Sequence, residues 1–468
     1  MHHRTLLAGL IAACLFSHSL SAATPELPRT PGLPYQVSGL ADRIVLTPGA
    51  DPSRQMAISY RTDARQTVSE IQLAPALDGP LLAQRARTLT GETPRTLRSE
   101  NGDARYHHVR LDDLQPDQAY VYRVKGHDGW SEWLQFRTAQ AGFAPFRFIY
   151  LGDVQNDILA LASRTVRQAL QNTANPALVV HAGDLVSQRD DLAHDDEWGE
   201  WSQAGGFHYA QVPQLPAVGN HEYVDHLDDQ GHETRLLGPH WPLQFALPRN
   251  GAEGAAETSY RVDYQGVRFI VLDGTSALDL GTLERQGRWL DTQLAGSEAR
   301  WNIVVVHQPL FTCARPEDSE PLKQAWKPIL DRHDVDLVLQ GHDHCYSRLS
   351  HPAGQAQASQ RRQAGEPQQG PVYLVSVAGS KMYGLNDRAA DQPDRSAEDT
   401  QLYQTVEVTA ERLEVRSYTV GGHLYDAFDL VRQDGHKYLR QPALELLPPR
   451  TCEGNQGPDG LPCSARDK

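Results

Sequence analysis

Two histidines separated by one residue follow a short apolar run in the second half of the chain. Residues 335–340 are mostly valine and leucine, and Gly341-His342-Asp343-His344 comes directly after them. An apolar run that stops at a glycine is typical of a buried strand that ends in a tight turn. Neutral imidazole is a good ligand for divalent metals, so these two histidines could hold a metal ion. One His-x-His pair alone is weak evidence, because most such pairs are structural.

Four further strand-like runs end in side chains of the same kind. The segments that follow them contain Asp153 and Gln155, Asp184, Asn220 with His221 and Glu222, and His307. Carboxylate, amide and imidazole groups at several strand ends could converge on one metal site. Taken singly, Asp153 could instead be a helix cap and His307 a hydrogen-bonded core histidine. The repetition of the pattern favours the metal site.

Two types of domain must position these residues. Residues 38–140 show short alternating runs broken by turn residues, which predicts an antiparallel β-sandwich that resembles a fibronectin type III domain. Residues 141–435 alternate apolar strands with helical segments such as 158–172 and 282–294, which predicts an α/β domain. We expect a surface loop at 349–370, two strands within 403–420, and a mostly irregular tail at 436–468.

The first residues of the chain have the pattern of an export signal. Residues 1–23 combine a basic start, an apolar stretch and small residues before position 24, and residues 24–37 are a proline-rich linker. A lipoprotein signal ending at Cys14 is the alternative. No later run approaches the ~18 apolar residues of a membrane span. The sequence therefore predicts an exported protein, periplasmic or secreted, with lipid anchoring at Cys14 as the minor alternative.

Charge and cysteine content narrow the function further. With 44 basic and 59 acidic residues the formal net charge is −15, which argues against a nucleic-acid polymer as partner. Cys313, Cys345, Cys452 and Cys463 lie beyond the signal, and an even number in an exported chain favours disulfides. We expect the pairs Cys313–Cys345 and Cys452–Cys463; two free buried thiols are the alternative for the first pair.

The five motifs, in this order, resemble those of the calcineurin-like metallophosphoesterases. With the preceding sandwich, residues 38–435 are similar to the purple acid phosphatase group of that family. The resemblance implies a double β-sheet flanked by helices and a binuclear metal centre. It also implies the ligand roles: Asp184 would bridge two ions, Asp153 and His344 would hold the first, and Asn220, His307 and His342 the second. A bridging carboxylate suits two ions ~3.5–4 Å apart.

The resemblance also implies residues that act on the substrate. His221 would contact the phosphoryl group or protonate the leaving group, and Glu222 could orient it, although a solvated or supporting role for Glu222 is equally consistent with the sequence. Arg315 could grip a phosphate by paired hydrogen bonds; a surface arginine is the alternative. Substrate choice would depend on the loops around 187–210, 312–325 and 349–370.

Two positions depart from the family pattern. Purple acid phosphatases carry a tyrosine three residues after the bridging aspartate, where this chain has Ser187. The wider superfamily places a histidine two residues after the first aspartate, where this chain has Gln155, a weaker oxygen ligand or a turn residue. We therefore expect a colourless protein with two divalent ions (manganese, zinc or ferrous iron) and an optimum towards neutral or alkaline pH.

Together these observations predict an exported phosphoesterase that hydrolyses small phosphomonoesters by attack of a metal-bound hydroxide. Phosphodiesters at the same site are the second hypothesis. A third, of a different class, is a non-catalytic surface-binding protein with a structural metal site. The presence of His221 argues against the third, because a structural site has no use for an unliganded histidine beside it.

Overall fold

The computed structural model describes residues 35–463, apart from 188, 228–229 and 453. The predicted export signal, 1–23, and all but the last residues of the predicted linker, 24–37, lie outside the described residues. Within the described part, no helix combines the length and apolar character needed to cross a membrane.

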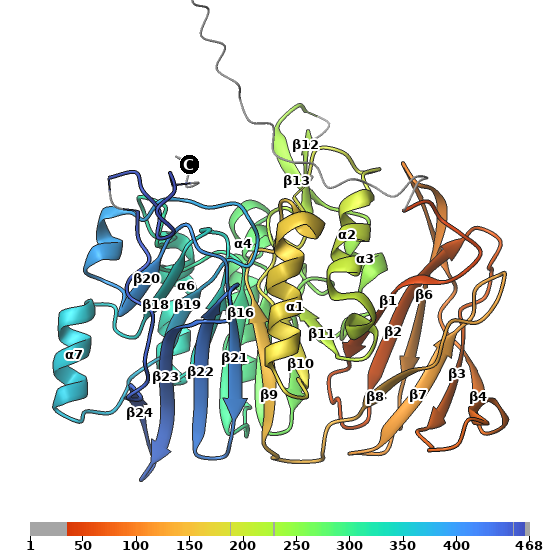
Figure 1. Ribbon diagram of the computed structural model, residues 1–468, viewed down its shortest axis with the longest axis horizontal. Helices are drawn as coiled ribbons and strands as arrows, with labels where there is room; N and C mark the ends of the chain where they lie inside the picture. The colour runs from red at the N-terminus through yellow and green to blue at the C-terminus, as the bar shows by residue number, and fades with distance from the viewer. Residues whose placement is uncertain (1–34, 188, 228–229, 453, 464–468) are drawn as a thin grey trace, which may run out of the picture.

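The N-terminal domain is the predicted antiparallel sandwich, at the right of Figure 1. One sheet has the strand order β1 (Asp42–Pro48), β2 (Met56–Asp63), β6 (Gly102–Leu111), β5 (Arg95–Ser99). The other has the order β4 (Arg87–Thr90), β3 (Glu70–Pro75), β7 (Ala119–Val124), β8 (Leu134–Arg137), and the short helix η1 (Leu82–Gln84) precedes β4. Buried residues of both sheets, such as Ile58 and Tyr122, form the interior between them.

The second domain contains two seven-stranded sheets, which confirms the predicted double-sheet architecture. The first has the order β11 (Gln214–Pro216), β10 (Leu178–His181), β9 (Phe146–Leu151), β21 (Leu402–Val408), β22 (Arg412–Thr419), β23 (Leu424–Gln433), β24 (His436–Arg440). The second has the order β14 (Tyr260–Tyr264), β15 (Val267–Leu272), β16 (Trp301–Val306), β17 (Leu337–Gln340), β19 (Val372–Val375), β18 (Tyr346–Leu349), β20 (Arg395–Ala397). A separate hairpin, β12 (Tyr223–Leu227) and β13 (Glu233–Leu237), projects from the top of the domain in Figure 1.

Helices flank the two sheets. They are η2 (Ile158–Ala162), α1 (Ser163–Asn172), α2 (Asp196–Gly205), η3 (Gly206–Ala210), α3 (Trp241–Gln244), α4 (Gly274–Asp279), α5 (Leu283–Ala295), α6 (Glu320–Arg332), α7 (Gln355–Gln363) and η4 (Asp387–Ala390). Two of the short helices, α3 and η3, contact strands of the sandwich. Helix α1 packs on β9 and β21 of the first sheet, and α5 packs on β15 of the second. The layers are therefore helix, sheet, sheet, helix.

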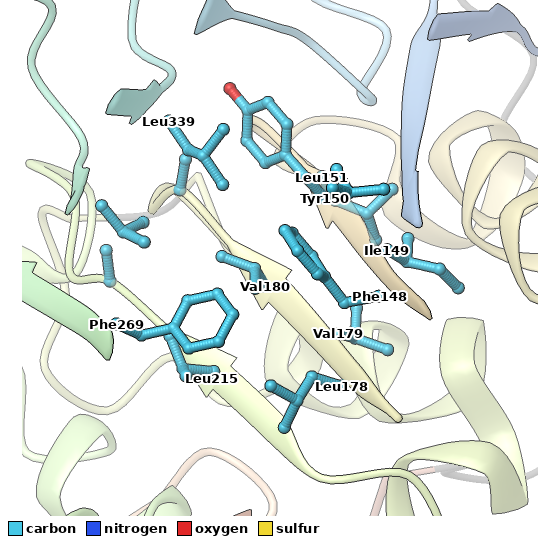
Figure 2. Packing of buried hydrophobic residues seen from close by; sticks show 14 of the residues in the cluster. Phe148, Ile149, Tyr150, Leu151, Leu178, Val179, Val180, Leu215, Phe269 and Leu339 are labelled. Atoms are coloured by element: carbon cyan, nitrogen blue, oxygen red, sulfur yellow. The ribbon is translucent and has the colours of Figure 1, made fainter. Parts of the chain in front are cut away.

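The main core lies between the two sheets (Figure 2). Phe148 of the first sheet meets Phe269 of the second edge to face, with ring centroids 5.4 Å apart. The buried hydroxyl of Tyr150 donates to the backbone oxygen of Gln340 and accepts from its N–H at 3.1 Å. Because apolar strands buried on both faces have little freedom to shift, this packing fixes the two sheets relative to each other at the ends of β9 and β17.

The structure differs from the predicted element boundaries at several places. The expected loop around 187–210 contains α2 and η3, and the one around 312–325 runs into α6. Strand β24 pairs with β23, so the sheet continues to Arg440 and the domain does not end at 435. The polar stretch 349–370 is only partly a loop, because it contains α7. Neither of these last two segments carries an apolar periodicity that would have indicated it: α7 has one buried residue, Ala358, and glutamine and arginine form most of the rest.

A buried ionic cluster joins the two domains. The side chain of Asp195, just before α2, is 1% exposed and contacts Arg43 at 2.6 Å and Arg61 at 2.8 Å, both from the sandwich. Asn101 of the sandwich donates to it at 3.0 Å, and His240 lies 3.1 Å from it. Charge-assisted hydrogen bonds from Arg43, Arg61 and Asn101 to Asp195 therefore fasten the sandwich to the second domain.

Candidate metal centre

The five predicted motifs meet at one edge of the double sheet. Strands β9, β10 and β11 run parallel, as do β16 and β17, so the carboxyl ends of each group face the same edge. The segments that follow these strands bring together the predicted ligands Asp153, Asp184, Asn220, His307, His342 and His344. Most of these side chains are buried: Asp153 and His307 are inaccessible to solvent, and Asp184 is 1% exposed.

The ligand atoms form two groups that share one residue. Asp184, His307 and His342 have ligand atoms within 4.8 Å of one another, and so do Asp153, Asp184 and His344. The side-chain oxygen of Asn220 lies 3.2 Å from Nε2 of His307 and joins the first group. This division matches the two ligand sets predicted from the sequence, with Asp184 common to both. A shared carboxylate between two such groups is the arrangement that a pair of divalent ions requires.

Backbone carbonyls fix the orientation of two of the imidazoles. Nδ1 of His307 lies 2.7 Å from the oxygen of Ala182, and Nδ1 of His344 lies 3.0 Å from the oxygen of Lys381. Each bond assigns the proton to Nδ1 and leaves Nε2 as a lone-pair donor towards the centre. His307 Nε2 is 3.1 Å from the carboxylate of Asp184.

The protein balances the carboxylate charges of this centre only in part: Asp184 and Asp153 raise the pKa of His307 to about 9, although burial opposes the rise. Asp153 Oδ1 and Gln155 Oε1 are buried and have no hydrogen-bond partner among the described residues. The pKa of Asp153 is raised to about 7, chiefly by burial and also by the neighbouring charge of Asp184, while His307 opposes the rise. Two buried carboxylates, one of them with an unpaired oxygen atom, and inward-facing imidazole nitrogens suit cations, so the residues present fit a binuclear metal site.

Gln155 takes a different orientation from the one predicted. Its side-chain nitrogen donates to Asp184 at 2.8 Å and lies 3.1 Å from Nε2 of His344. The structure therefore places a donor, and not an oxygen ligand, next to the two groups. Rotation of the amide by 180° would exchange the two atoms and turn Oε1 towards the centre.

Glu222 does not occupy the catalytic position expected for it. Its buried carboxylate accepts backbone N–H groups of Asp184 at 3.0 Å, Leu185 at 2.7 Å and Gly219 at 2.6 Å. Burial raises its pKa to about 8, although these bonds oppose the rise. Glu222 thus connects the turn that carries Asp184 to the turn that carries Asn220. This is the supporting role that the sequence left open, and not the orientation of His221.

His221 faces the centre without joining either ligand group. Its Nδ1 contacts the backbone oxygen of Ser187, and its Nε2 lies 4.0 Å from Asp184. Its backbone N–H donates to the other oxygen of Asp184 at 2.9 Å, which fixes the turn. The imidazole lines a cleft of about 330 Å³ that opens onto the candidate metal centre.

Comparison with known sequence families gives matches to both domains. The family described as Purple acid Phosphatase, N-terminal domain, matches residues 41–138, and Calcineurin-like phosphoesterase matches residues 146–346. The second segment contains every predicted metal ligand. The chain belongs to the purple acid phosphatase group of calcineurin-like phosphoesterases.

Individual relatives of this group are distant. An uncharacterized protein of Mycobacterium tuberculosis is 28% identical over 337 residues, which cover 65% of this chain and 61% of that protein's length. The Fe(3+)-Zn(2+) purple acid phosphatase 12 of Arabidopsis thaliana is 24% identical over 394 residues, 80% of this chain and 82% of its own.

Solved structures agree with the fold. A purple acid phosphatase from yellow lupin (Lupinus luteus) seeds superposes with a TM-score of 0.64 at 16% identity, covering 84% of this chain and 75% of that one. The structure of PhoD gives 0.60 at 13% identity, covering 87% and 93%.

At the position where purple acid phosphatases carry a tyrosine, this chain has Ser187. The hydroxyl of Ser187 donates to Glu197 at 2.6 Å, so it is held towards α2. Tyr223, the alternative tyrosine suggested by the sequence, is buried and donates to Asp273 at 2.5 Å. The tyrosine that lies at the centre is Tyr383, whose ring packs edge to face on His344 with centroids 4.9 Å apart.

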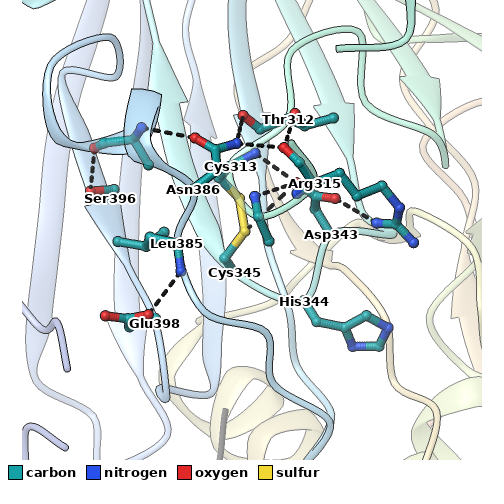
Figure 3. Close-up of a disulfide and its surroundings, with 12 residues drawn as sticks. Thr312, Cys313, Arg315, Asp343, His344, Cys345, Leu385, Asn386, Ser396 and Glu398 are labelled. Atoms are coloured by element: carbon teal, nitrogen blue, oxygen red, sulfur yellow. Dashed lines mark hydrogen bonds and ion pairs between the residues drawn. A yellow bond between two sulfur atoms is a disulfide. The ribbon is translucent and has the colours of Figure 1, made fainter. Parts of the chain in front are cut away.

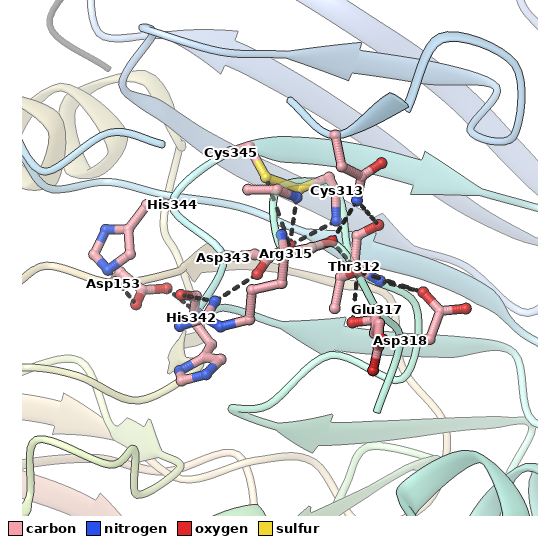
Figure 4. A network of polar contacts seen from close by, with 12 residues as sticks. Asp153, Thr312, Cys313, Arg315, Glu317, Asp318, His342, Asp343, His344 and Cys345 are labelled. Atoms are coloured by element: carbon pink, nitrogen blue, oxygen red, sulfur yellow. Dashed lines mark hydrogen bonds and ion pairs between the residues drawn. A yellow bond between two sulfur atoms is a disulfide. The ribbon is translucent and has the colours of Figure 1, made fainter. Parts of the chain in front are cut away.

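The cleft includes residues that sequence reasoning missed. Besides His221 and Arg315, it is lined by Arg189, Arg235, Lys381 and Tyr383. Arg315 contacts the carboxylate of Asp343 and donates to the backbone oxygen of His342 at 2.9 Å (Figure 4). Its side chain is 31% exposed, so the guanidinium contacts the ligand turn on one side and faces the cleft on the other.

Both predicted disulfides are present, Cys313–Cys345 and Cys452–Cys463, each with Cα atoms 6.3 Å apart. The first lies beside the centre, because Cys345 directly follows His344 (Figure 3). Asp343 accepts the backbone N–H groups of Cys313 and Ala314, each at 2.6 Å. The segment after β16 and the His-x-His turn are therefore fastened together covalently and by hydrogen bonds.

Proposed function

We propose that this chain is a binuclear-metal phosphoesterase that hydrolyses small phosphomonoesters. The observation that carries the proposal is the pair of ligand groups that share Asp184, with an unliganded histidine beside them on an open cleft. Asp153 and His344 would hold one ion, Asn220, His307 and His342 the other, and Asp184 both. Gln155 would be a ligand only with its amide rotated.

Two divalent ions in this centre would neutralise charge on the phosphoryl group and supply a nucleophile from water at neutral pH. The chain's own residues would keep the ligand side chains in position. Backbone carbonyls of Ala182 and Lys381 hold the imidazoles of His307 and His344 in one orientation, and Glu222 holds two ligand turns together. Such pre-formed geometry lowers the cost of organising charge in the transition state.

His221 is the residue placed for proton transfer. The contact of its Nδ1 with the backbone oxygen of Ser187 leaves Nε2 facing the cleft. From there a protonated imidazole can donate to the leaving oxygen or to a phosphoryl oxygen. This position supports a catalytic centre over a structural metal site, which would give no function to an imidazole held beside the ligands.

The proposal includes export and the metal types. Two disulfides, one of them beside the centre, suit an oxidising compartment such as the periplasm or the exterior. A ligand set of carboxylates, imidazoles and an amide, without a tyrosine at position 187, suits two divalent ions such as manganese, zinc or ferrous iron.

The test is hydrolysis of p-nitrophenyl phosphate by protein that has been stripped of metal and reloaded with one divalent ion at a time. We expect turnover that rises with bound metal and saturates at two ions per chain, measured by elemental analysis. Loaded protein that binds two ions and hydrolyses neither this substrate nor bis(p-nitrophenyl) phosphate would contradict the proposal and support the structural-site hypothesis.

A further inference from the structure

Four cationic side chains line the cleft at the candidate metal centre, and three of them are matched by carboxylates. The three pairs are Arg189–Asp225, Arg235–Asp279 and Arg315–Asp343. The fourth, Lys381, has no carboxylate within 4.0 Å among the described residues. A cation that lines a cleft without a protein counter-charge is available to an anion that enters it.

The backbone around Lys381 is fixed to a metal-ligand residue. The oxygen of Lys381 contacts Nδ1 of His344 at 3.0 Å, and the N–H of Tyr383 donates to the backbone oxygen of His344 at 3.1 Å. These two contacts hold the segment after β19 against the ligand turn. The starting point of the Lys381 side chain is therefore set by the metal centre itself.

The side chain of Lys381 shares an aromatic surface with Arg315. Its Nζ lies 5.5 Å from the ring centroid of Tyr383, and the guanidinium carbon of Arg315 lies 5.7 Å from the same centroid. Both distances are in the range of cation–π contact. The ring of Tyr383 thus supports two cations on one wall of the cleft, next to His344.

The same segment is anchored at its far end. The backbone N–H of Asn386 donates to the backbone oxygen of Cys313 at 2.8 Å, and its side-chain nitrogen donates to the backbone oxygen of Arg315 at 2.7 Å. Leu385 donates its N–H to Glu398 at 2.8 Å (Figure 3). With both ends held, the segment presents Lys381 as part of a rigid wall, and less of its binding energy is lost to ordering.

We propose that Lys381 binds a non-bridging phosphate oxygen of the substrate and gives the centre its preference for phosphomonoester dianions over phosphodiester monoanions. The proposal rests on the phosphoesterase function proposed above. An ammonium group interacts more strongly with a group of two negative charges than with a group of one. A diester also carries a second organic substituent in place of an oxygen that Lys381 could contact.

The experiment compares wild-type protein with Lys381→Met and Lys381→Arg, all loaded with the same metal. Orthophosphate binding is measured by calorimetry, and KM and kcat are measured for p-nitrophenyl phosphate and bis(p-nitrophenyl) phosphate. Methionine keeps the length of the side chain and the backbone oxygen that contacts His344, so metal content should not change. Lys327→Met, on the outer helix α6, is the matched control.

For Lys381→Met we expect orthophosphate binding and the KM of the monoester to weaken by about 10- to 100-fold, the scale of a hydrogen bond to a charged group. The diester KM should change by less than about threefold, and Lys381→Arg should recover most of the loss. Unchanged orthophosphate affinity in Lys381→Met with two ions bound would overturn the proposal.

The binding measurement separates this proposal from the proposed function. If the loaded wild type hydrolyses neither ester, the phosphoesterase function fails, and calorimetry still decides whether Lys381 holds a phosphate. If hydrolysis is normal and the monoester-to-diester ratio is the same in wild type and Lys381→Met, the function stands and the role of Lys381 is wrong. Loss of metal in both variants would also overturn it, because Lys381 would then act only through His344.

Discussion

Asp184 and Asp195 lie close together in the sequence, and each has a side chain that is 1% exposed, yet their surroundings differ. Asp195 is contacted by two guanidinium groups, an amide and an imidazole. Asp184 has an amide, a backbone N–H and imidazoles, and it lies near Asp153, a second buried carboxylate. Asp195 has permanently charged arginines as counter-charges, whereas Asp184 shares its site with a second carboxylate and has only titratable imidazoles, among them His307, whose pKa the two carboxylates raise to about 9 against the effect of burial.

This difference predicts that Asp195 contributes to the stability of the fold and Asp184 to metal binding. A buried charge needs compensation, and a carboxylate that arginines already satisfy gains nothing from an added cation. Two carboxylates that share titratable imidazoles are less completely compensated in the metal-free protein, and they gain more when metal cations bind. The Asp195 cluster should therefore hold the domains together, and the Asp184 centre should hold ions.

The largest expected effect is that of Asp184→Asn. Removal of the shared charge should lower bound metal below two ions per chain and reduce hydrolysis by more than about 10⁴-fold, the scale of losing an essential group. The metal-free protein should also lose some stability at neutral pH, because the imidazoles of His307 and His221 outweigh the effect of burial and hold the pKa of Asp184 well below its usual value in the folded chain. Two bound ions with near-normal turnover would show that Asp184 is not the bridge.

His221→Ala should come next. It removes a group that faces the cleft and leaves both ligand groups intact, so kcat should fall by roughly 10²–10⁴-fold, the range for a positioned acid or base. Elemental analysis should still find two ions. A loss of metal together with activity would place His221 among the ligands.

Asp195→Asn should act on stability instead. Burial alone would raise the pKa of Asp195, but His240 and the two arginines lower it below its usual value. Asparagine would leave Arg43 and Arg61 without their buried counter-charge, at a cost of about 3–5 kcal/mol in the free energy of unfolding. Denaturant unfolding at neutral pH measures this loss, and metal content and KM should match the wild type.

The pH dependence of that loss gives a further control. A carboxylate whose folded-state pKa is lowered stabilises the fold above its unfolded pKa, about 4, and loses that contribution as the pH falls. The stability difference between wild type and Asp195→Asn should therefore be constant from neutral pH down to about pH 5 and shrink below pH 4. A difference that does not shrink would mean that the cluster acts through packing.

Metal removal should have a moderate effect on stability. At an ion concentration 100 times the Kd, loading should stabilise the wild type by about 2.7 kcal/mol. Asp195→Asn should retain this increment and Asp184→Asn should lose most of it, as measured by denaturant unfolding with and without chelator. An increment lost equally in both variants would contradict the division between the two carboxylates.

The smallest expected effect is spectroscopic. Ser187, at the position of the family's tyrosine, has no phenolate and donates its hydroxyl to Glu197. Tyr223 donates its hydroxyl to Asp273 and so does not face the metal centre. We therefore expect no visible absorption band. Tyr383 packs against the ligand residue His344 and lines the cleft. If a band and ferric iron are both found, its disappearance in Tyr383→Phe would assign the phenolate to Tyr383.

The sequence predicted the parts of the molecule that local patterns specify. Strand ends followed by Asp, Asn or His located the ligands, because one edge of a double sheet collects such residues. Lys381 and Tyr383 were missed, since they lie in an irregular segment without a motif and reach the centre only by contacts with His344.

Other features depend on contacts that no local pattern contains. Glu222 follows His221 directly, yet its side chain turns to backbone N–H groups of other turns. Three partners of Asp195 are distant in sequence and come from the sandwich: Arg43, Arg61 and Asn101. Charge pairing of that kind is determined by how the domains dock, and a single sequence does not record it.

The backbone at the metal centre limits how its ligands could be exchanged. Asp184, His342 and His344 have φ angles of 51°, 71° and 48°, in the left-handed region that aspartate, asparagine and histidine tolerate better than most residues. A β-branched or bulky replacement there would meet a conformational penalty in addition to any change in coordination. Attempts to redesign the metal preference of this scaffold should therefore begin at Asp153, Asn220 and His307, where φ is not positive and side-chain chemistry alone decides the outcome.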